Sequence, residues 1–286
     1  MPALDELLST LQLRVLVASR MRLWPDWKVD EHALPCNKIY FPYGGRGAFA
    51  LDGREHMLRP RHVALLPAKR QNRCWQDPRD PVEKIWVHFD ARVLGLVDLF
   101  DVLPCPAPFD TQGDPEIQRL LEALVEEAKA PAPYQGLAQT GMLALILARI
   151  LRLAEKQKVP AAIRHPLVEK EALRGPGDRI GAVLEHIAAH YAKDLSLEDL
   201  AKVVHLHPTY FSNHFRKATG VAPMAFLQKF RIERAKGLLS TSDLTVAEAG
   251  AKVGFPDPYH FSRVFKKLTG SAPKAFQDSV RRTSNQ

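Results

Sequence analysis

The feature that most constrains the fold of this chain is an internal repeat in its C-terminal third. Residues 211–226 recur as residues 261–276, an offset of fifty, and ten of the sixteen positions are identical. The shared residues are Phe, Ser, Phe, Lys, Thr, Gly, Ala, Pro, Ala and Phe, in that order. Because only two copies occur, the repeat indicates a duplicated unit and excludes a solenoid, which needs three or more copies.

Each copy is predicted to form two helices joined by a tight turn. In the first copy Ser196 begins a helix and Gly220 ends the next one; in the second, Thr245 begins a helix and Gly254 lies in the turn. Short polar residues at helix starts and glycine past helix ends are common boundaries. We expect helix-turn-helix units at about 196–219 and 245–269, held at a fixed separation by a linker helix at about 223–239.

The second helix of each unit has an apolar side that is expected to pack and an opposite polar side. The packing residues are Phe211, Phe215 and Ala218 in one copy and Phe261, Val264, Phe265 and Leu268 in the other. Asparagine can bond adenine and arginine can bond guanine in a major groove, while nearby cations hold phosphates. A merely solvated face is the alternative for one such helix, but two duplicated faces favour base reading. The outward residues are Thr209, Ser212, Asn213, Arg216, Tyr259, Ser262, Arg263 and Lys266.

The charge distribution supports a nucleic-acid partner for the same part of the chain. Residues 176–286 hold 16 Lys and Arg against 10 Asp and Glu, so they carry +6 of the formal net charge of +8. A basic segment of this kind favours double-stranded DNA as the partner. The stretch 159–177 is rich in proline and glycine, which is typical of a linker. We therefore expect an N-terminal domain at 1–158, a linker at 159–177 and a C-terminal domain at 178–286.

Residues 178–286 resemble the DNA-binding domain of the AraC/XylS transcription regulators. The resemblance is most specific over residues 253–267 (VGFPDPYHFSRVFKK) and continues through Thr269, Gly270 and Pro273. It implies that the outward residues read bases and that helix N-termini seat phosphates. Two departures stand out: His205 replaces the usual glycine of the first turn, and Ala249-Gly250 replaces the usual Ile-Ala. The second departure predicts a thinner core in the second unit, since both residues are smaller than the usual ones, and a lower stability, because glycine within a helix costs about 1 kcal/mol.

The N-terminal half shows a different pattern, with short apolar runs separated by Gly, Pro and Asp. This pattern predicts a β-sandwich or small barrel over about 13–110, and no Rossmann or P-loop glycine motif occurs. Helical spacing then takes over at about 114–156, starting from Asp114 as N-cap with Pro115 at the first helical position. The predicted strands are Leu13–Ala18, Lys38–Phe41, Gly47–Leu51, His62–Pro67 and Lys84–Phe89.

The helix predicted at 137–156 is apolar over most of its circumference. One side can cover the barrel while the other needs a partner, so we expect a homodimer through this helix; burial of both sides within one chain is the alternative. The most apolar stretch, Met142–Ala148, is too short and too charged at its flanks to predict a membrane span. Asp5 and Glu6 stand where a signal peptide needs positive charge. These features predict a cytoplasmic protein with no membrane partner.

Residues 40–89 resemble the cupin-like sensor domain of the same regulators, on the segments 47–53, 58–67 and 86–90. The resemblance implies a jelly-roll barrel followed by dimerising helices. We expect a small organic effector that carries a sugar or an aromatic ring. Aromatic residues that can line the barrel mouth and stack on a ring are the candidate ligand contacts. They are Trp24, Trp27, Tyr40, Tyr43, Trp75, Trp86 and His88, each of which can instead be a packing residue.

Two other functions remain open at this point. Many cupins are metal-dependent enzymes, but His56, His62 and His88 are scattered and no HxH followed by Glu appears, so we expect no metal, no cofactor and no catalysis. Cys36, Cys74 and Cys105 form no CxxC pair and are expected to be idle thiols in a reducing compartment. A ligand-independent DNA-binding protein is the other alternative. The favoured function is a transcription regulator. The resemblance implies an activator and adds the hypothesis of contact with RNA polymerase, whereas the sequence itself does not distinguish an activator from a repressor.

Overall fold

The computed structural model of the 286-residue chain describes residues 2–162 and 176–284. Contacts divide the chain into two compact units, each of which is treated separately below. The barrel unit comprises Gln12–Arg92 and Asp98–Glu171, and the helical unit comprises Met1–Leu11, Val93–Val97 and Ala172–Gln286. Of the predicted linker at 159–177, residues 163–175 lie outside the described residues.

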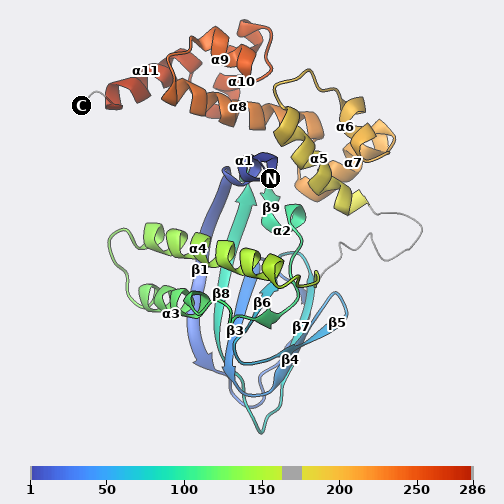
Figure 1. Ribbon diagram of the computed structural model, residues 1–286, viewed down its shortest axis with the longest axis vertical. Helices are drawn as coiled ribbons and strands as arrows, with labels where there is room; N and C mark the ends of the chain where they lie inside the picture. The colour runs from blue at the N-terminus through green and yellow to red at the C-terminus, as the bar shows by residue number, and fades with distance from the viewer. Residues whose placement is uncertain (1, 163–175, 285–286) are drawn as a thin grey trace. The chain divides into compact units, whose positions relative to one another are not determined.

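The barrel unit consists of two antiparallel sheets with helices over one of them (Figure 1). The first sheet has the order β1-β8-β3-β6-β10, and the second has the order β2-β7-β4-β5. All five predicted strands are present. The strands of the first sheet are β1 (Leu11–Arg22), β8 (Glu83–Val93), β3 (Asn37–Gly44), β6 (His62–Leu66) and β10 (Phe109–Asp110). Those of the second are β2 (Val29–Ala33), β7 (Gln71–Gln76), β4 (Gly47–Leu51) and β5 (Arg54–Leu58), and β9 spans Val97–Asp98.

Alternate side chains of strand β8 face opposite sides of the first sheet. Ile85, Val87 and Phe89 are fully buried on the side of the sheet on which α3 lies, while Lys84, Trp86 and His88 point the other way, between the two sheets. The register sets these residues opposite β3, with Tyr40 across from Trp86 and Lys38 across from His88. The space between the sheets is otherwise filled by an apolar cluster that includes Leu34, Phe49, Leu51, Leu66 and Cys74.

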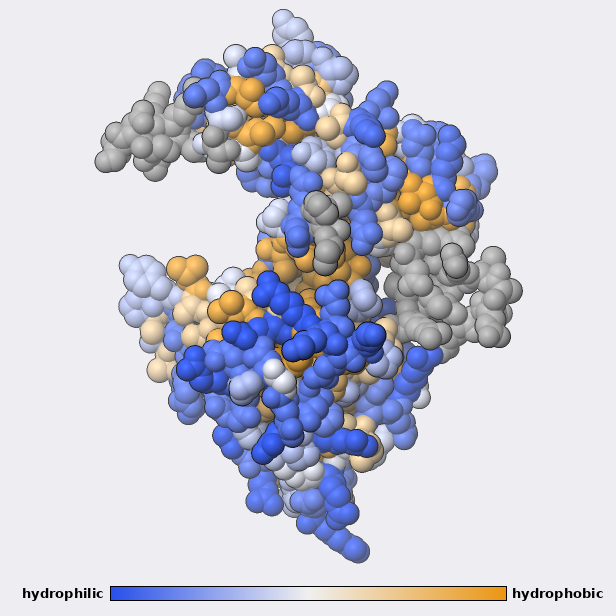
Figure 2. Space-filling model, viewed as in Figure 1, coloured by the Kyte–Doolittle hydropathy of each residue, from blue (hydrophilic) through white to orange (hydrophobic). Residues whose placement is uncertain are grey.

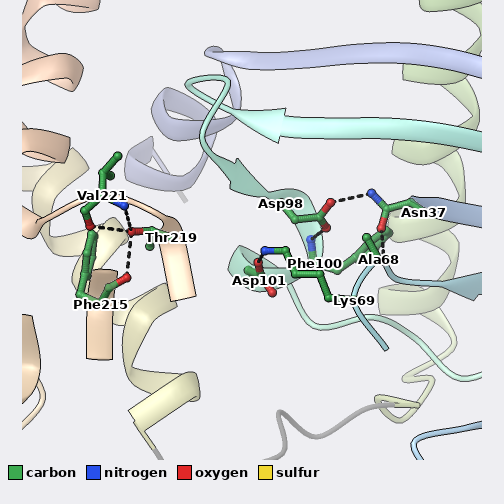
Figure 3. A network of polar contacts seen from close by, with 9 residues as sticks. All are labelled: Asn37, Ala68, Lys69, Asp98, Phe100, Asp101, Phe215, Thr219 and Val221. Atoms are coloured by element: carbon green, nitrogen blue, oxygen red, sulfur yellow. Dashed lines mark hydrogen bonds and ion pairs between the residues drawn. The ribbon is translucent and has the colours of Figure 1, made fainter. Parts of the chain in front are cut away.

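Three helices complete the barrel unit: α2 (Leu99–Val102), α3 (Glu116–Ala128) and α4 (Gln135–Lys156). Asp98 caps α2 by accepting from the Phe100 N–H at 3.0 Å and accepts from Asn37 Nδ2 at 2.7 Å, which ties α2 to β3 (Figure 3). Helix α3 starts one residue later than expected, with Pro115 as its N-cap. Asp114 still accepts from the Glu116 N–H at 3.2 Å and also pairs with Arg149 of α4 at 2.8 Å.

Helix α4 buries one side and exposes another. Leu143, Ile146 and Ile150 are fully buried, whereas Leu137 is 74% and Leu145 is 55% exposed. Hydrophobic residues accordingly reach the surface over α4 in Figure 2. By length and composition alone, the whole helix Gln135–Lys156 is long and apolar enough to cross a membrane, although its most apolar part, Met142–Ala148, is too short to do so. The core helix of a globular domain passes the same test.

The helical unit contains both predicted helix-turn-helix motifs. Its helices are α1 (Pro2–Leu8), α5 (Pro176–His190), α6 (Leu197–Val203), α7 (Pro208–Thr219), α8 (Pro223–Thr241), α9 (Val246–Lys252), α10 (Pro258–Thr269) and α11 (Pro273–Ser284). Helices α6 and α7 form the first motif, α9 and α10 the second, and α8 packs against all four. Ser196 and Thr245 each close a capping box, at the start of α6 and α9 respectively. The prediction of two equivalent units on one linker helix is therefore confirmed.

The repeat is visible in the atomic detail as well as in the sequence. Thr219 Oγ1 lies 2.8 Å from the Phe215 carbonyl and accepts from the Val221 N–H, which fixes the turn between α7 and α8 (Figure 3). Thr269 does the same at the end of α10, with Phe265 and Ser271 as partners. Gly220 and Gly270 follow at φ +82° and +84°, left-handed positions that glycine adopts without strain.

The apolar sides of α7 and α10 pack as expected, with one exception. Phe211, Phe215, Phe261 and Phe265 are fully buried, but Leu268 is 45% exposed, so its predicted place in the core is wrong. Leu268 lies near the end of α10. The core next to it is filled by Phe276, which packs against Phe265 with ring centroids 5.6 Å apart.

The two departures from the family pattern have distinct physical consequences. His205 occupies the left-handed region with φ 51°, where glycine would be unstrained. Gly250 lies against the Phe261 ring, and an added Cβ would come within 2.9 Å of it. The Phe261 ring therefore occupies the space beside Gly250 that a larger residue would take, and the lower stability of the second unit stays a prediction.

Candidate DNA interface and effector site

The eight predicted base-reading residues lie on the sides of α7 and α10 that the core leaves free. Thr209, Asn213 and Arg216 are exposed on α7, and Arg263 and Lys266 are exposed on α10. Tyr259 is 83% exposed at the start of α10. Ser212 and Ser262 are half-buried on the borders of the two faces. Each helix thus exposes a row of side chains that carry hydroxyl, amide or cationic groups. Such groups can form hydrogen bonds with base edges in a major groove.

The cations on these faces are not neutralised within the protein. No carboxylate of residues 2–162 or 176–284 forms an ion pair with Arg216, Arg263 or Lys266. An exposed and unpaired guanidinium can make the two parallel hydrogen bonds that guanine offers. The ends of both reading helices therefore carry positive charge available for DNA.

Arg231 in the middle of α8 connects the segment that follows α5 to the turn of the second motif. Its Nε donates to the Tyr191 carbonyl and its Nη2 to the Lys193 carbonyl, both at 2.7 Å, at and beyond the C-terminal end of α5. The guanidinium also lies 5.6 Å from the centroid of the Phe255 ring, in the turn of the second motif. Gly254 permits this approach, because a Cβ there would come within 2.9 Å of Arg231. One buried side chain therefore holds α5, α8 and the second turn together.

The seven candidate ligand contacts fall into two groups in the barrel unit. Tyr40, Trp86 and His88 lie between the sheets, and Trp27 packs against the same apolar cluster. Trp24 is 58% exposed, and Tyr43 lies on the other side of the first sheet, where its hydroxyl donates to Glu122 of α3 at 2.7 Å. Trp75 carries the Arg73 guanidinium over its ring at 4.8 Å. The interior group of four is the one that a bound molecule could contact together.

Comparisons with known proteins bear on both units. Residues 200–279 match the family model of a helix-turn-helix domain, and residues 25–146 match that of an AraC-like ligand binding domain. The chain belongs to the AraC family of transcription regulators. This AraC-family chain is 27% identical to the arabinose operon regulatory protein of Escherichia coli over 225 residues, which cover 74% of this chain and 70% of that relative.

Two further comparisons complete the set. An uncharacterized HTH-type transcriptional regulator of Bacillus subtilis, YobQ, is 25% identical over 79% of each chain. The crystal structure of the DNA-binding domain of AdpA in complex with a target DNA is 30% identical and covers 38% of this chain and 97% of its own, with a TM-score of 0.37. The two family models together make the AraC-family chain a DNA-binding transcription regulator with an N-terminal ligand-binding domain.

Sequence reasoning missed two lysines that share the barrel interior with the aromatic group. Lys84 is 2% exposed and Lys38 is 8% exposed, and neither forms an ion pair with a carboxylate of the described residues. Burial lowers the pKa of Lys84 to about 7, and burial also lowers the pKa of His88, to about 4, with both lysines adding to that effect. The strand alternation of residues 84, 86 and 88 was the available signal, since it sets Lys84 on the same face as Trp86.

No metal centre is apparent in the residues that the structure describes, where no three His, Cys, Asp or Glu side chains gather to hold an ion. His56 stacks on Phe49 with ring centroids 5.2 Å apart, whereas His62 Nδ1 lies 3.1 Å from the Pro60 carbonyl. The two histidines therefore have different neighbours. Cys36, Cys74 and Cys105 are buried, free thiols.

Proposed function

We propose that this regulator binds promoter DNA sequence-specifically as a homodimer, that a small organic molecule in the barrel controls it, and that it activates transcription through contact with RNA polymerase in the cytoplasm. It has no catalytic role in this proposal. The observation that carries it is the pair of equivalent helices, α7 and α10, whose aromatic sides are buried and whose polar sides are free. Helix α8 packs against both motifs and holds them on one scaffold.

The separation of the two reading helices gives the proposal a geometric test. Two helices on one scaffold enter successive major-groove segments when they are about one DNA turn, roughly 34 Å, apart. We expect Asn213 on α7 and Arg263 on α10 to read positions about 10 base pairs apart. Random-sequence DNA selection with the purified full chain would define the site, and the Asn213→Ala and Arg263→Ala variants would each relax one part of it.

A variant outside the reading helices and the salt dependence of binding serve as controls for the DNA selection. Lys236→Ala removes a cation of α8 that pairs with Glu233 at 2.9 Å, and is expected to leave the selected sequence unchanged. Affinity should also fall by orders of magnitude between about 50 and 200 mM salt, since several phosphates are neutralised. Selection that returns no preferred sequence, or a flat response to salt, would overturn the proposed function.

The exposed side of α4 supports the proposed homodimer. Leu137 and Leu145 project from it, and the spacing of Gly141, Ala144 and Ala148 sets small residues on the same side, which allows close approach of a second helix. Leu145→Glu is expected to give monomers in sedimentation velocity. Met57→Glu is the matched control, because Met57 is also 55% exposed but lies on β5. Dimers that survive Leu145→Glu would contradict the use of α4.

A further inference from the structure

The barrel interior holds buried polar atoms that lack hydrogen-bond partners. Among the described residues, the buried side-chain atoms without a partner include Lys84 Nζ, Trp86 Nε1, Asn72 Nδ2 and His56 Nε2, all in the barrel unit. Buried polar groups are nearly always paired, and an unpaired one lowers the stability of the fold. Three of these four atoms are donors only. Most of the unpaired atoms of the interior therefore need an acceptor as their partner.

Lys84 is the most costly of these groups because it carries a charge when protonated. Its ammonium lies 3.4 Å from the centroid of the Tyr40 ring and 4.6 Å from that of the Trp27 ring, so aromatic faces surround it. Cation–π contacts offset only part of the cost of removing an ammonium from water. An ammonium in this setting is stabilised much further by an anion that reaches its N–H groups.

Within residues 2–162 and 176–284, no such anion lies beside Lys84. Lys38 lies close enough to lower the pKa of Lys84 further, and both lysines lower the pKa of His88, which is therefore neutral at pH 7. Cys74 and Tyr40 are the other titratable neighbours, and burial raises the pKa of Tyr40, so that its hydroxyl stays neutral. Among the described residues, the interior thus holds two lysines and no carboxylate that could balance their charge when they are protonated.

We propose that the barrel interior binds a small organic acid, with the carboxylate of the acid paired to Lys84. Lys38 adds to the positive potential, Trp86 Nε1 donates to a carboxylate oxygen, and the apolar or aromatic body of the acid packs on Tyr40 and Trp27. The proposal rests on the barrel being the effector site of the proposed function, and it names the chemical class of that effector.

The same residues argue against other ligand classes. A neutral sugar presents hydroxyl donors as well as acceptors, and it needs carboxylate or carbonyl acceptors that this cluster does not offer. Free inorganic phosphate would satisfy the lysines but would set a strongly hydrated ion against aromatic faces. A carboxylate on an apolar body matches both parts of the cluster. Trp27, Trp86 and His88 keep part of their surface exposed and mark the side from which the acid can enter.

Thermal unfolding of the full chain in the presence of defined probes tests the proposal. The probes are acetate, butyrate and benzoate, each with its neutral amide, and arabinose as a neutral sugar, all at about 20 mM. Tryptophan fluorescence reports the barrel unit directly, because Trp24, Trp27, Trp75 and Trp86 are the chain's four tryptophans. At least one acid is expected to raise the midpoint by about 2 °C or more, and its amide is expected to have no effect.

Two variants and a control assign the effect to Lys84. Lys84→Met is expected to abolish the shift and to melt no lower than the wild type without ligand, because it replaces an unpaired buried cation. Lys84→Gln keeps a donor but no charge and is expected to weaken binding at least about tenfold. Lys28→Met removes an exposed lysine of the same unit, and its response to acid should match that of the wild type.

The outcomes separate this proposal from the proposed function. If no acid stabilises the wild type more than Lys84→Met, the acid site is overturned. If arabinose or an amide stabilises both proteins equally, the acid is again overturned, while a neutral effector remains compatible with the regulator. DNA selection without any ligand decides the proposed function independently of these melting experiments.

Discussion

Replacing Arg231 by methionine should release the segment that follows α5 from α8 and from the turn of the second motif. Methionine keeps an unbranched apolar stem in the core but removes both N–H groups that reach the Tyr191 and Lys193 carbonyls at 2.7 Å. Each hydrogen bond from a charged donor contributes about 1.5–3 kcal/mol. Burial lowers the pKa of Arg231, which shows that desolvation offsets part of this gain. We therefore expect the free energy of unfolding of the helical unit to fall by about 3 kcal/mol.

The assay follows the two units with different signals during urea unfolding of the full chain. Circular dichroism at 222 nm reports mainly helices, whereas tryptophan fluorescence reports the barrel unit alone. With an m-value of about 1–3 kcal/mol per molar urea, the loss should lower the midpoint of the helical transition by about 1 M or more. The fluorescence transition of the barrel unit should not move.

Two further variants sharpen the Arg231 result. Arg231→Lys keeps the charge but cannot direct two N–H groups at two separate carbonyls, so it should recover only part of the loss. Lys236→Met breaks a half-exposed pair with Glu233 on the same helix and should cost less than about 0.5 kcal/mol. An Arg231→Met midpoint within about 0.2 M of the wild type would refute the coupling role, since m-values of this size would then leave almost no loss to explain.

Three further predictions concern DNA reading, backbone conformation and pH. Arg263→Ala should cost about 1–3 kcal/mol of affinity for the selected site and relax one base pair; an equal loss on random DNA would instead make Arg263 a phosphate contact. Gly270→Ala should lower the stability of the helical unit by about 1 kcal/mol, because φ is +84° there, whereas Gly237→Ala within α8 should raise it by a similar amount in thermal melts; the opposite order would refute the strain argument. Because burial lowers the pKa of Lys84 to about 7, the unfolded chain holds one more proton than the folded chain above that pH. Barrel stability should then rise between pH 7 and 9 by up to about 1.4 kcal/mol per pH unit relative to Lys84→Met, and parallel pH profiles for the two proteins would contradict this.

The helical unit could be predicted closely from the sequence because its signals are local. Ser196 and Thr245 close capping boxes within one turn, and the glycines after α7 and α10 end those helices by their own backbone freedom. The duplication then doubled each signal. The prediction that Leu268 is buried was wrong because helical periodicity gives the side of a helix on which a residue lies but not how far the core extends beneath that side.

The barrel unit was predicted less completely because its remaining strands depend on distant partners. Strands β2, β5 and β7 carry Asp, Glu, Arg, Gln and Asn, so they show no apolar run. Strands β5 and β7 form because β4 lies in register between them, with Phe49 opposite both His56 and Cys74, and β2 forms by pairing with β7. Strand content set by pairing rather than by local propensity cannot be recognised from a short window of sequence.

The same limit explains why the lysines of the barrel escaped notice while the arginines of the reading helices did not. An exposed cation such as Arg263 needs no partner, since water solvates it, and its role follows from the helix that carries it. A buried cation such as Lys84 is defined by what surrounds it, and only the register of β3 and β8 brings Tyr40, Trp86 and Lys38 around one interior. A charge that lowers the stability of the free protein is retained at no net cost if a ligand stabilises it in the bound state. In the regulator that we propose, the exposed cations therefore bind DNA and the buried cations bind a single small acid.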